Sequence, residues 1–198
     1  MAEESASAKK AYFAGKITFE EWARRDVELW KGHSYEDIAQ VARSSSIILP
    51  GAKELIELLQ ARGIVVALVS GGLCVQSYWV ADQLGVPHDL VLTNVLGTCC
   101  NESGNTVLDG TVAVNVELDA KGRLVADLAA AHGISMDCVC HVGDDENDIP
   151  AFRVCRESVA VNPKSQLTRD VAKHCIENCI DLRDLVSLLI LDPLNSKL

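Results

Sequence analysis

Residues 141–152 read HVGDDENDIPAF, and within them an apolar run ends in a cluster of acids. Four of the five residues from Asp144 to Asp148 are acidic, and they follow directly on Cys138–Val142. A short run without polar alternation is typical of a strand that is buried on both faces of a parallel sheet. Ligands of open parallel sheets bind beyond the carboxyl ends of the strands. The stretch therefore predicts a binding site in an α/β fold.

Two interpretations of the acidic cluster stay open at this point. Crowded carboxylates repel one another, and a bound cation favours their ionised form. Oxygen ligands suit Mg²⁺, which keeps several waters and often bridges to a substrate phosphate. Alternatively, the acids cap a helix that begins at Asp148, where the helix dipole stabilises negative charge. A cap needs only one acid, so the others are surplus to it.

Two further segments have residue types that suit a phosphoryl group. Ser70-Gly71-Gly72 follows the apolar run Ile64–Val69, so a hydroxyl and glycine N–H groups precede a helix and can hold an anion. Lys121 stands at the start of a later helix. Considered alone, the Ser-Gly-Gly segment could equally be a strand-to-helix turn, and the lysine could be an ordinary surface residue. In this order along the chain they predict a hydroxyl, an ammonium and a metal-binding carboxylate around one phosphoryl group.

The chain alternates helices with apolar strands, which predicts a doubly wound, Rossmann-like parallel sheet. The stretch from about Ser7 to Arg43 is expected to be helical and rich in aromatics, with Thr18 and Ser34 as helix caps, and Ser44 to Ser46 is expected to be a linker. A hairpin is expected over Gly97–Val116. The expected strands are Ile64–Val69, Leu90–Leu92, Cys138–Val142 and Ser158–Val161, and the expected core helices are Ala52–Arg62, Leu73–Leu84, Lys121–His132, Ile149–Val154, Gln166–Lys173 and Leu182–Leu189.

Composition limits the classes of partner. The net charge of −10 argues against nucleic acid and anionic membranes, and no apolar stretch is long enough to span a bilayer. The start of the chain has no signal-peptide pattern, so a cytoplasmic location is expected. Eight cysteines are present without zinc-type spacing, which predicts reduced core thiols; a reactive or metal-binding cysteine is the alternative.

The sequence resembles the haloacid dehalogenase superfamily, in its phosphoserine-phosphatase-like branch. The matching stretches are LVSGG (68–72), DAKGRLVADLAAAHGI (119–134) and HVGDDENDIPAF, with VLDGTVAV (107–114) like the hairpin of the branch and residues 11–32 like part of its helical cap. The resemblance implies a partial helical cap over residues 1–46 and an α/β core over residues 47–198. It also implies a Mg²⁺-dependent phosphatase that acts on a small phosphorylated metabolite through an aspartyl-phosphate.

The resemblance also assigns roles to individual residues. Ser70 is expected to bond the transferring phosphoryl group, with the Gly71 N–H beside it. Lys121 is expected to stabilise the phosphoryl oxygens, and Asn147 to help orient them. Asp144 is the expected Mg²⁺ ligand, and Asp148 belongs to the same metal and orienting group.

One element of that family is not found in the chain. The nucleophile should stand in an Asp-x-Asp element at the end of a first strand, before the cap. Asp109 comes nearest, but Thr111 follows it where the second aspartate should be. The chain is therefore expected to be truncated at its N-terminus, without the first core strand, and to have at most trace activity by itself. A catalytically inactive remnant or binding module is the alternative, and a phosphoacceptor signalling domain is a remote one.

The cap also departs from true phosphoserine phosphatases, which hold the serine carboxylate with an arginine. Counting from Phe19, the place of that arginine falls on Asp26, while Arg24 and Arg25 stand close by. Either arginine could substitute, or both are solvated surface charges. The expected substrate is therefore a small phosphomonoester of unspecified identity.

Overall fold

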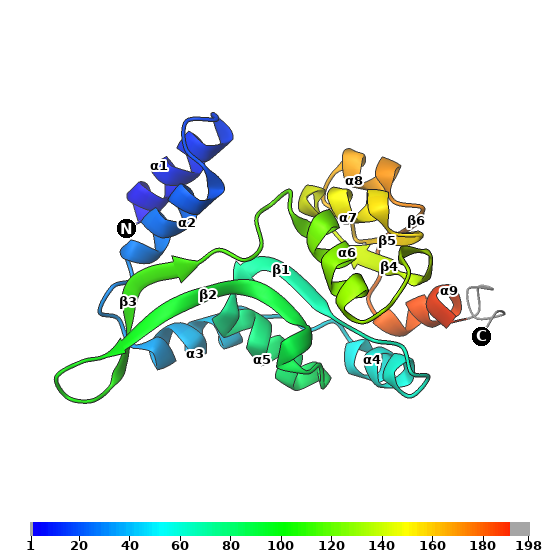
Figure 1. Cartoon of the computed structure of the whole chain (residues 1–198), viewed down its shortest axis with the longest axis horizontal. Helices are drawn as coiled ribbons and strands as arrows, with labels where there is room; N and C mark the ends of the chain where they lie inside the picture. The colour runs from blue at the N-terminus through cyan, green and yellow to red at the C-terminus, as the bar shows by residue number, and fades with distance from the viewer. Residues whose placement is uncertain (1, 191–198) are drawn as a thin grey trace. The chain divides into compact units, whose positions relative to one another are not determined.

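The computed structural model describes residues 2–190 (Figure 1). The chain divides into two compact units that exchange segments along the sequence. Unit 1 comprises the residues up to Ile47, Ser70–Asp82 and Val86–Glu117, and unit 2 comprises Ile48–Val69, Gln83–Gly85 and the chain from Leu118 onward. The division into a cap through residue 46 and a core from residue 47 stays a prediction.

The helices of unit 1 begin where the sequence places polar caps. The Thr18 hydroxyl accepts a hydrogen bond from the N–H of Glu21 at 3.1 Å, and the Ser34 hydroxyl accepts one from Asp37 at 3.3 Å. Both predicted caps are confirmed, since each oxygen satisfies a free N–H of a first turn. The helices are α1 (Ala2–Phe13), α2 (Phe19–Glu28), α3 (Tyr35–Ser45) and α5 (Cys74–Leu84, whose last two residues belong to unit 2), with the 3-10 turn η1 (His88–Leu90).

The serine linker predicted from Ser44 is wrong, because α3 continues through Ser45. The hydroxyl of Ser44 donates to the carbonyl of Gln40 at 2.8 Å, and that of Ser45 donates to Ala42 at 3.1 Å. Bonds of this kind satisfy serine side chains within a helix, so a run of serines does not have to end it.

A three-stranded sheet in the order β1-β2-β3 carries the predicted hairpin (Figure 1). β2 and β3 pair antiparallel, and their register shifts at a bulge between Leu96 and Thr98. The core of unit 1 packs Val27 and Ala39 of the helices against Leu96 and Leu108 of the hairpin. The strands are β1 (Leu68–Leu73), β2 (Val91–Cys100) and β3 (Thr106–Ala113).

The strand predicted at Ile64–Val69 is displaced along the chain. β1 begins at Leu68 and continues through Ser70, Gly71 and Gly72, so this tripeptide is extended and is not a strand-to-helix turn. Its two glycine carbonyls accept hydrogen bonds from side chains of β2, which hold the backbone in a strand conformation. Residues 64–67 form no regular element. Local sequence could not indicate this, because the partners lie more than twenty residues away.

Unit 2 contains a parallel sheet in the order β4-β5-β6 with helices around it, so the predicted α/β class is confirmed. Its core gathers Leu55 and Leu59 of α4, Val159 and Val161 of β5, and Leu185. The strands are β4 (Cys140–Gly143), β5 (Glu157–Val161) and β6 (His174–Ile176); the helices are α4 (Ala52–Gln60), α6 (Lys121–Ala131), α7 (Ile149–Val154), α8 (Gln166–Val171) and α9 (Val186–Ile190), with 3-10 turns η2 (Met136–Cys138), η3 (Glu146–Asp148) and η4 (Leu182–Leu185).

Two strand predictions in unit 2 need correction. β4 starts at Cys140, because Cys138 ends the 3-10 turn η2. Within residues 2–190, the side chain of Val142 is 42% exposed. The prediction that this strand is buried on both faces is therefore wrong. β6 was not predicted, since three residues with a histidine and a cysteine give no apolar run.

The cysteines divide by exposure. Cys74, Cys155 and Cys179 are buried, and Cys140 is half-buried. Burial raises the pKa of Cys140 to about 12 and that of Cys155 to about 11, so both thiols stay protonated at neutral pH. The prediction of core thiols is wrong for the other four, which are exposed: Cys99, Cys100, Cys138 and Cys175.

Between residues 2 and 190, no helix combines the length and the apolar character that crossing a lipid bilayer would require.

Candidate functional site

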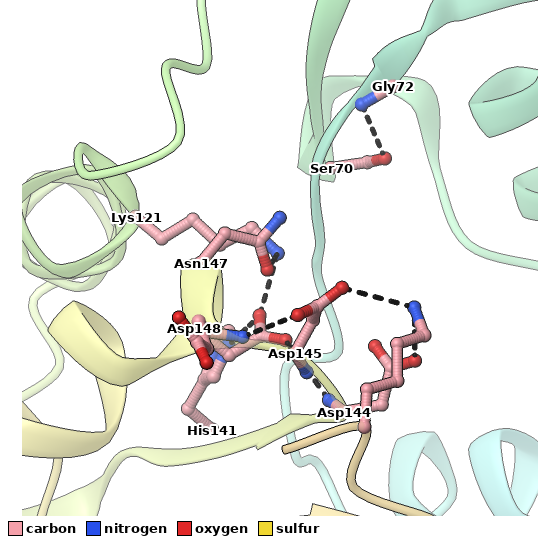
Figure 2. A network of polar contacts seen from close by, with 10 residues as sticks. Ser70, Gly72, Lys121, His141, Asp144, Asp145, Asn147 and Asp148 are labelled. Carbon is pink, nitrogen blue, oxygen red and sulfur yellow. Dashed lines mark hydrogen bonds and ion pairs between the residues drawn. The ribbon is translucent and has the colours of Figure 1, made fainter. Parts of the chain in front are cut away.

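The carboxylate of Asp148 is the centre of a polar cluster in unit 2 (Figure 2). Its Oδ1 accepts hydrogen bonds from Lys121 Nζ at 2.6 Å and from His141 Nε2 at 3.0 Å. Its Oδ2 accepts from the backbone N–H groups of Asp144 at 3.0 Å and Asp145 at 3.2 Å. Asp148 is 3% exposed, so these four donors take the place of water around a buried charge.

Local sequence places this carboxylate. Asp145 caps the turn η3 by accepting from the N–H of Glu146 at 2.7 Å, and Asp148 completes a capping box with it. Gly143 ends β4 directly below, and a Cβ there would collide with the Asp148 carboxyl group. Asp145 and Asp148 thus cap the 3-10 turn that precedes the expected helix. The expectation that the acids cap the helix from Asp148 itself is wrong, because Asp148 makes no side-chain cap bond to α7.

The charge of Asp148 is stabilised despite its burial. Burial by itself raises the pKa of a carboxyl group. Here the hydrogen bond from His141, and then the charge and hydrogen bond of Lys121, outweigh burial and hold the pKa of Asp148 well below its usual range. Asp148 is therefore ionised at neutral pH, and the lysine beside it has a permanent counter-charge.

Lys121 is held in one orientation. It is 7% exposed, and its ammonium also contacts Asn147 Oδ1 at 3.4 Å, next to the short bond to Asp148. An ammonium group has three N–H donors, and these two oxygens use two of them. Among residues 2–190 no third acceptor contacts it. A fixed ammonium with one free donor is suited to an anion.

Asp144 differs from Asp148 because its carboxylate lies at the surface. The side chain is 49% exposed, and it pairs with Lys164 Nζ at 2.8 Å. The same lysine lies 3.3 Å from Asp145 Oδ2, and the hydrogen bond that Lys164 donates to Asp144 raises the pKa of Lys164. An exposed pair of this kind is weak, so a cation can displace the lysine.

The metal site expected from the sequence has few ligands in this chain. Within the described residues, no three His, Cys, Asp or Glu side chains gather closely enough to form a metal cage. Asp148 already has four hydrogen-bond donors, so Asp144, the ligand expected from the sequence, is the more available of the two predicted carboxylates. This fits Mg²⁺, which often takes one or two carboxylates and keeps its waters.

The Ser70-Gly71-Gly72 segment belongs to unit 1. The Ser70 hydroxyl oxygen accepts a hydrogen bond from the N–H of Gly72 at 3.1 Å (Figure 2). The Gly71 carbonyl accepts from Asn94 Nδ2 at 3.0 Å. Of the predicted site residues, the structure thus brings together Lys121, Asn147 and Asp148, with the backbone of Asp144, in one unit, and Ser70 with Gly71 in the other.

Arg24, Arg25 and Asp109, which the sequence analysis considered for substrate binding or as the nucleophile, contact other residues. Arg24 and Arg25 both pair with Glu21 on the exposed side of α2, at 3.1 and 2.8 Å, as surface charges do. Asp26 Oδ1 is buried and finds no hydrogen-bond partner among residues 2–190. Asp109 accepts from the backbone N–H and the hydroxyl of Thr111, both at 2.7 Å, and so stabilises the hairpin.

Sequence reasoning missed three participants. His141 shares the Asp148 oxygen with Lys121, and its place at the end of a predicted strand does not indicate this partner. Lys164 reaches Asp144 from a loop twenty residues later, and no local pattern indicates this pairing. Asn94 lies inside β2, and the one available signal is that an asparagine in an apolar run must find hydrogen-bond partners if it is buried; the sequence does not indicate which partners these are.

Comparison with known proteins identifies the family of the chain. The profile of the haloacid dehalogenase-like hydrolase family matches residues 1–153. The phosphoserine phosphatase of Methanocaldococcus jannaschii is 31% identical, over 94% of this chain and 83% of the relative. That of Albidiferax ferrireducens is 30% identical, over 88% and 73%.

A solved structure described as a phospho-aspartyl intermediate analogue of phosphoserine phosphatase has a fold similar to that of this chain. The TM-score is 0.73 at 30% identity, and the match covers 94% of this chain and 85% of the other. The chain therefore belongs to the haloacid dehalogenase-like hydrolases and is similar within them to the phosphoserine phosphatases.

Proposed function

We propose that this chain binds the phosphoryl group of a small phosphomonoester and belongs to a Mg²⁺-dependent phosphatase. The observation that carries the proposal is the ammonium of Lys121, which is fixed by Asp148 and Asn147 with one N–H donor free. A lysine with a purely structural role would not require a buried carboxylate, such as that of Asp148, that is itself held by four donors. A lysine that must meet a phosphoryl oxygen in one place does need such a partner.

The other predicted residues have complementary roles in this proposal. The Ser70 hydroxyl and the Gly71 N–H donate to phosphoryl oxygens, and Lys121 neutralises their charge. Asp144 would hold Mg²⁺, which when bound supplies further positive charge to the phosphoryl group. Asp148 orients Lys121 and is saturated by its four donors, so Asp144 is the stronger candidate for the ligand.

A second candidate function is a binding module without turnover. The sequence has no aspartate followed two positions later by another, so the residues at hand include no candidate for the aspartyl nucleophile of the family. The phosphate-binding residues would remain useful in such a module. Turnover assays separate the two candidates, whereas phosphate binding is common to both.

The substrate class in this proposal is a small phosphomonoester. Phosphoserine is the substrate named for the relatives. In this chain Asp26 stands where a carboxylate-binding arginine is expected, and Arg24 and Arg25 are engaged by Glu21. The group attached to the phosphate is therefore left open.

Titration with inorganic phosphate, followed by ³¹P NMR, tests the proposal. We expect wild type to bind, and Lys121→Met to bind at least tenfold more weakly, because the free ammonium donor is lost. Lys53→Met is the control, since Lys53 is an exposed helix lysine with a loose partner at 4.0 Å. Absence of binding by wild type, or equal affinity in Lys121→Met, contradicts the proposal.

The metal role has its own test. Calorimetric titration with Mg²⁺ should give weak binding that Asp144→Asn removes, because an amide lacks the charge of the proposed ligand. Asp127→Asn is the control, as Asp127 is exposed and pairs only with Arg123 one helical turn away. Unchanged Mg²⁺ affinity in Asp144→Asn would exclude Asp144 as the ligand.

A further inference from the structure

A buried asparagine of β2, Asn94, lies at the centre of a hydrogen-bond network in unit 1. It is 2% exposed. Its Nδ2 donates to the carbonyls of Gly71 at 3.0 Å and Val116 at 3.1 Å. Its Oδ1 accepts from the N–H groups of Asn115 at 2.9 Å and Val116 at 2.8 Å. All four hydrogen-bonding positions of the amide are thus in use.

One of these bonds leads to Ser70 through a single peptide group. Asn94 holds the carbonyl of Gly71, and the N–H of the same peptide belongs to Gly72, which donates to Ser70 Oγ at 3.1 Å. In a trans peptide the C=O and N–H point in opposite directions from one rigid plane. Fixing the carbonyl therefore fixes the direction of the N–H that contacts the serine.

The bond also determines what the Ser70 hydroxyl can do. Its oxygen accepts from Gly72, so its own proton remains available to donate. Across the described part of the chain, that hydroxyl donates to no acceptor. A hydroxyl that is held by one bond and free to donate is oriented for an oxyanion.

The neighbouring residue secures the second glycine in the same way. Thr93 Oγ1 donates to the carbonyl of Gly72 at 3.1 Å. A threonine has one hydroxyl proton, so Ser77, at 2.9 Å, must donate to Thr93 and not the reverse. Both glycine carbonyls are therefore held by buried side chains of adjacent residues.

We propose that Asn94 is a positioning residue that orients the hydroxyl of Ser70 through the Gly71–Gly72 peptide. This inference rests on the proposed function of Ser70 as a phosphate donor. Only an amide suits the position, because the side chain must donate to carbonyls and accept from N–H groups at once. Aspartate has the same shape but cannot donate, and it would place a buried charge against two carbonyl oxygens.

Amide hydrogen exchange tests the link without any ligand. In ¹⁵N-glycine-labelled protein, we expect the Gly72 amide to exchange at least tenfold faster in Asn94→Asp and in Ser70→Ala than in wild type. Asn115→Ser is the control, since it removes one bond to the Thr93 carbonyl and leaves that to Gly71. Wild-type exchange of Gly72 in folded Asn94→Asp overturns the inference. If that variant does not fold, equal exchange in wild type and Ser70→Ala overturns it.

A double-mutant cycle with inorganic phosphate completes the test. We expect Asn94→Asp to weaken phosphate binding about tenfold in the wild-type background and to have no further effect in Ser70→Ala, because Asn94 acts through that hydroxyl. Undiminished binding by Asn94→Asp contradicts the inference. If wild type binds no phosphate while the exchange effects are as expected, the proposed function fails and the positioning of Ser70 by Asn94 stands.

Discussion

At the residue scale, the pair of Lys121 and Asp148 is expected to dominate the energetics of the site. Removing one partner of a buried ion pair leaves the other charge uncompensated. Asp148→Asn should therefore lower the free energy of unfolding at pH 7 by about 3 kcal/mol or more, since Lys121 is 7% exposed. Denaturant unfolding measures this, with Asp137→Asn as an exposed control. A loss equal to that of the control would mean that the pair contributes little.

The same residue predicts a pH dependence. The pKa of Asp148 is lower in the folded protein than in the unfolded chain, mainly through His141 and Lys121, which outweigh burial. The contribution of the Asp148 charge to the free energy of unfolding is therefore fully present above the pKa of the unfolded chain, about 4. It is lost as the pH falls toward the lower pKa of the folded protein. The stability difference between wild type and Asp148→Asn should shrink below about pH 4. A difference that stays constant from pH 7 to pH 3 would contradict this assignment.

Residue types could be predicted from the sequence better than residue partners. A lysine and several carboxylates at one site followed from their order along the chain. The sequence did not indicate which carboxylate contacts Lys121. Asp144 and Asp148 are only four residues apart, and it is in the structure that one is buried and the other exposed. The partner of Asn94 could not be predicted either, because Gly71 is 23 positions away along the chain.

At the element scale, α6 and α7 approach closely at a glycine. A Cβ on Gly122 would lie 2.5 Å from the carbonyl oxygen of Pro150 and 2.8 Å from its carbon. Alanine normally stabilises a helix interior by about 1 kcal/mol relative to glycine. Here we expect Gly122→Ala to destabilise by about 1–3 kcal/mol, because one of the helices must shift. Thermal unfolding measures this, with the exposed neighbour Arg123→Ala as control. A stabilised Gly122→Ala would show that the helices separate at no cost.

Elements defined by local periodicity were predicted well. The helices at Ala52, Lys121 and Ile149 begin where caps, glycines and apolar spacing placed them. β1 was misplaced because its conformation depends on bonds to β2, and Ser70-Gly71-Gly72 has the composition of a turn. The error concerns the segment with proposed phosphate chemistry. Local propensity is expected to fail at functional sites, where distant contacts decide the backbone.

At the scale of the whole molecule, the sequence predicted the α/β class and the family. It did not predict which segments make up each of the two compact units. Each unit draws on segments that are not contiguous, and each has its own apolar core, with Leu108 central in one and Leu185 in the other. Composition changes along the chain mark contiguous domains only. The exchange of segments depends on contacts that no single stretch encodes.

The whole chain also sets the expectation for catalysis. The proposed phosphate-binding roles of Ser70, Gly71 and Lys121 need no nucleophile, whereas a covalent phosphoryl transfer requires one. Since no Asp-x-Asp element occurs among the 198 residues, binding and turnover should separate in this chain. Loss of a covalent nucleophile typically costs several orders of magnitude in rate.

We therefore expect the purified chain to hydrolyse an aryl phosphate in the presence of Mg²⁺ at no more than a trace rate, while it still binds inorganic phosphate. A continuous absorbance assay measures turnover, and the Lys121→Met variant reports the background. Mg²⁺-dependent turnover well above that background, abolished by Asp144→Asn, would contradict the expectation. It would also imply that a residue outside the family pattern attacks phosphorus, because Asp148, the carboxylate bonded to Lys121, is saturated by four donors and Asp144 has the proposed metal role.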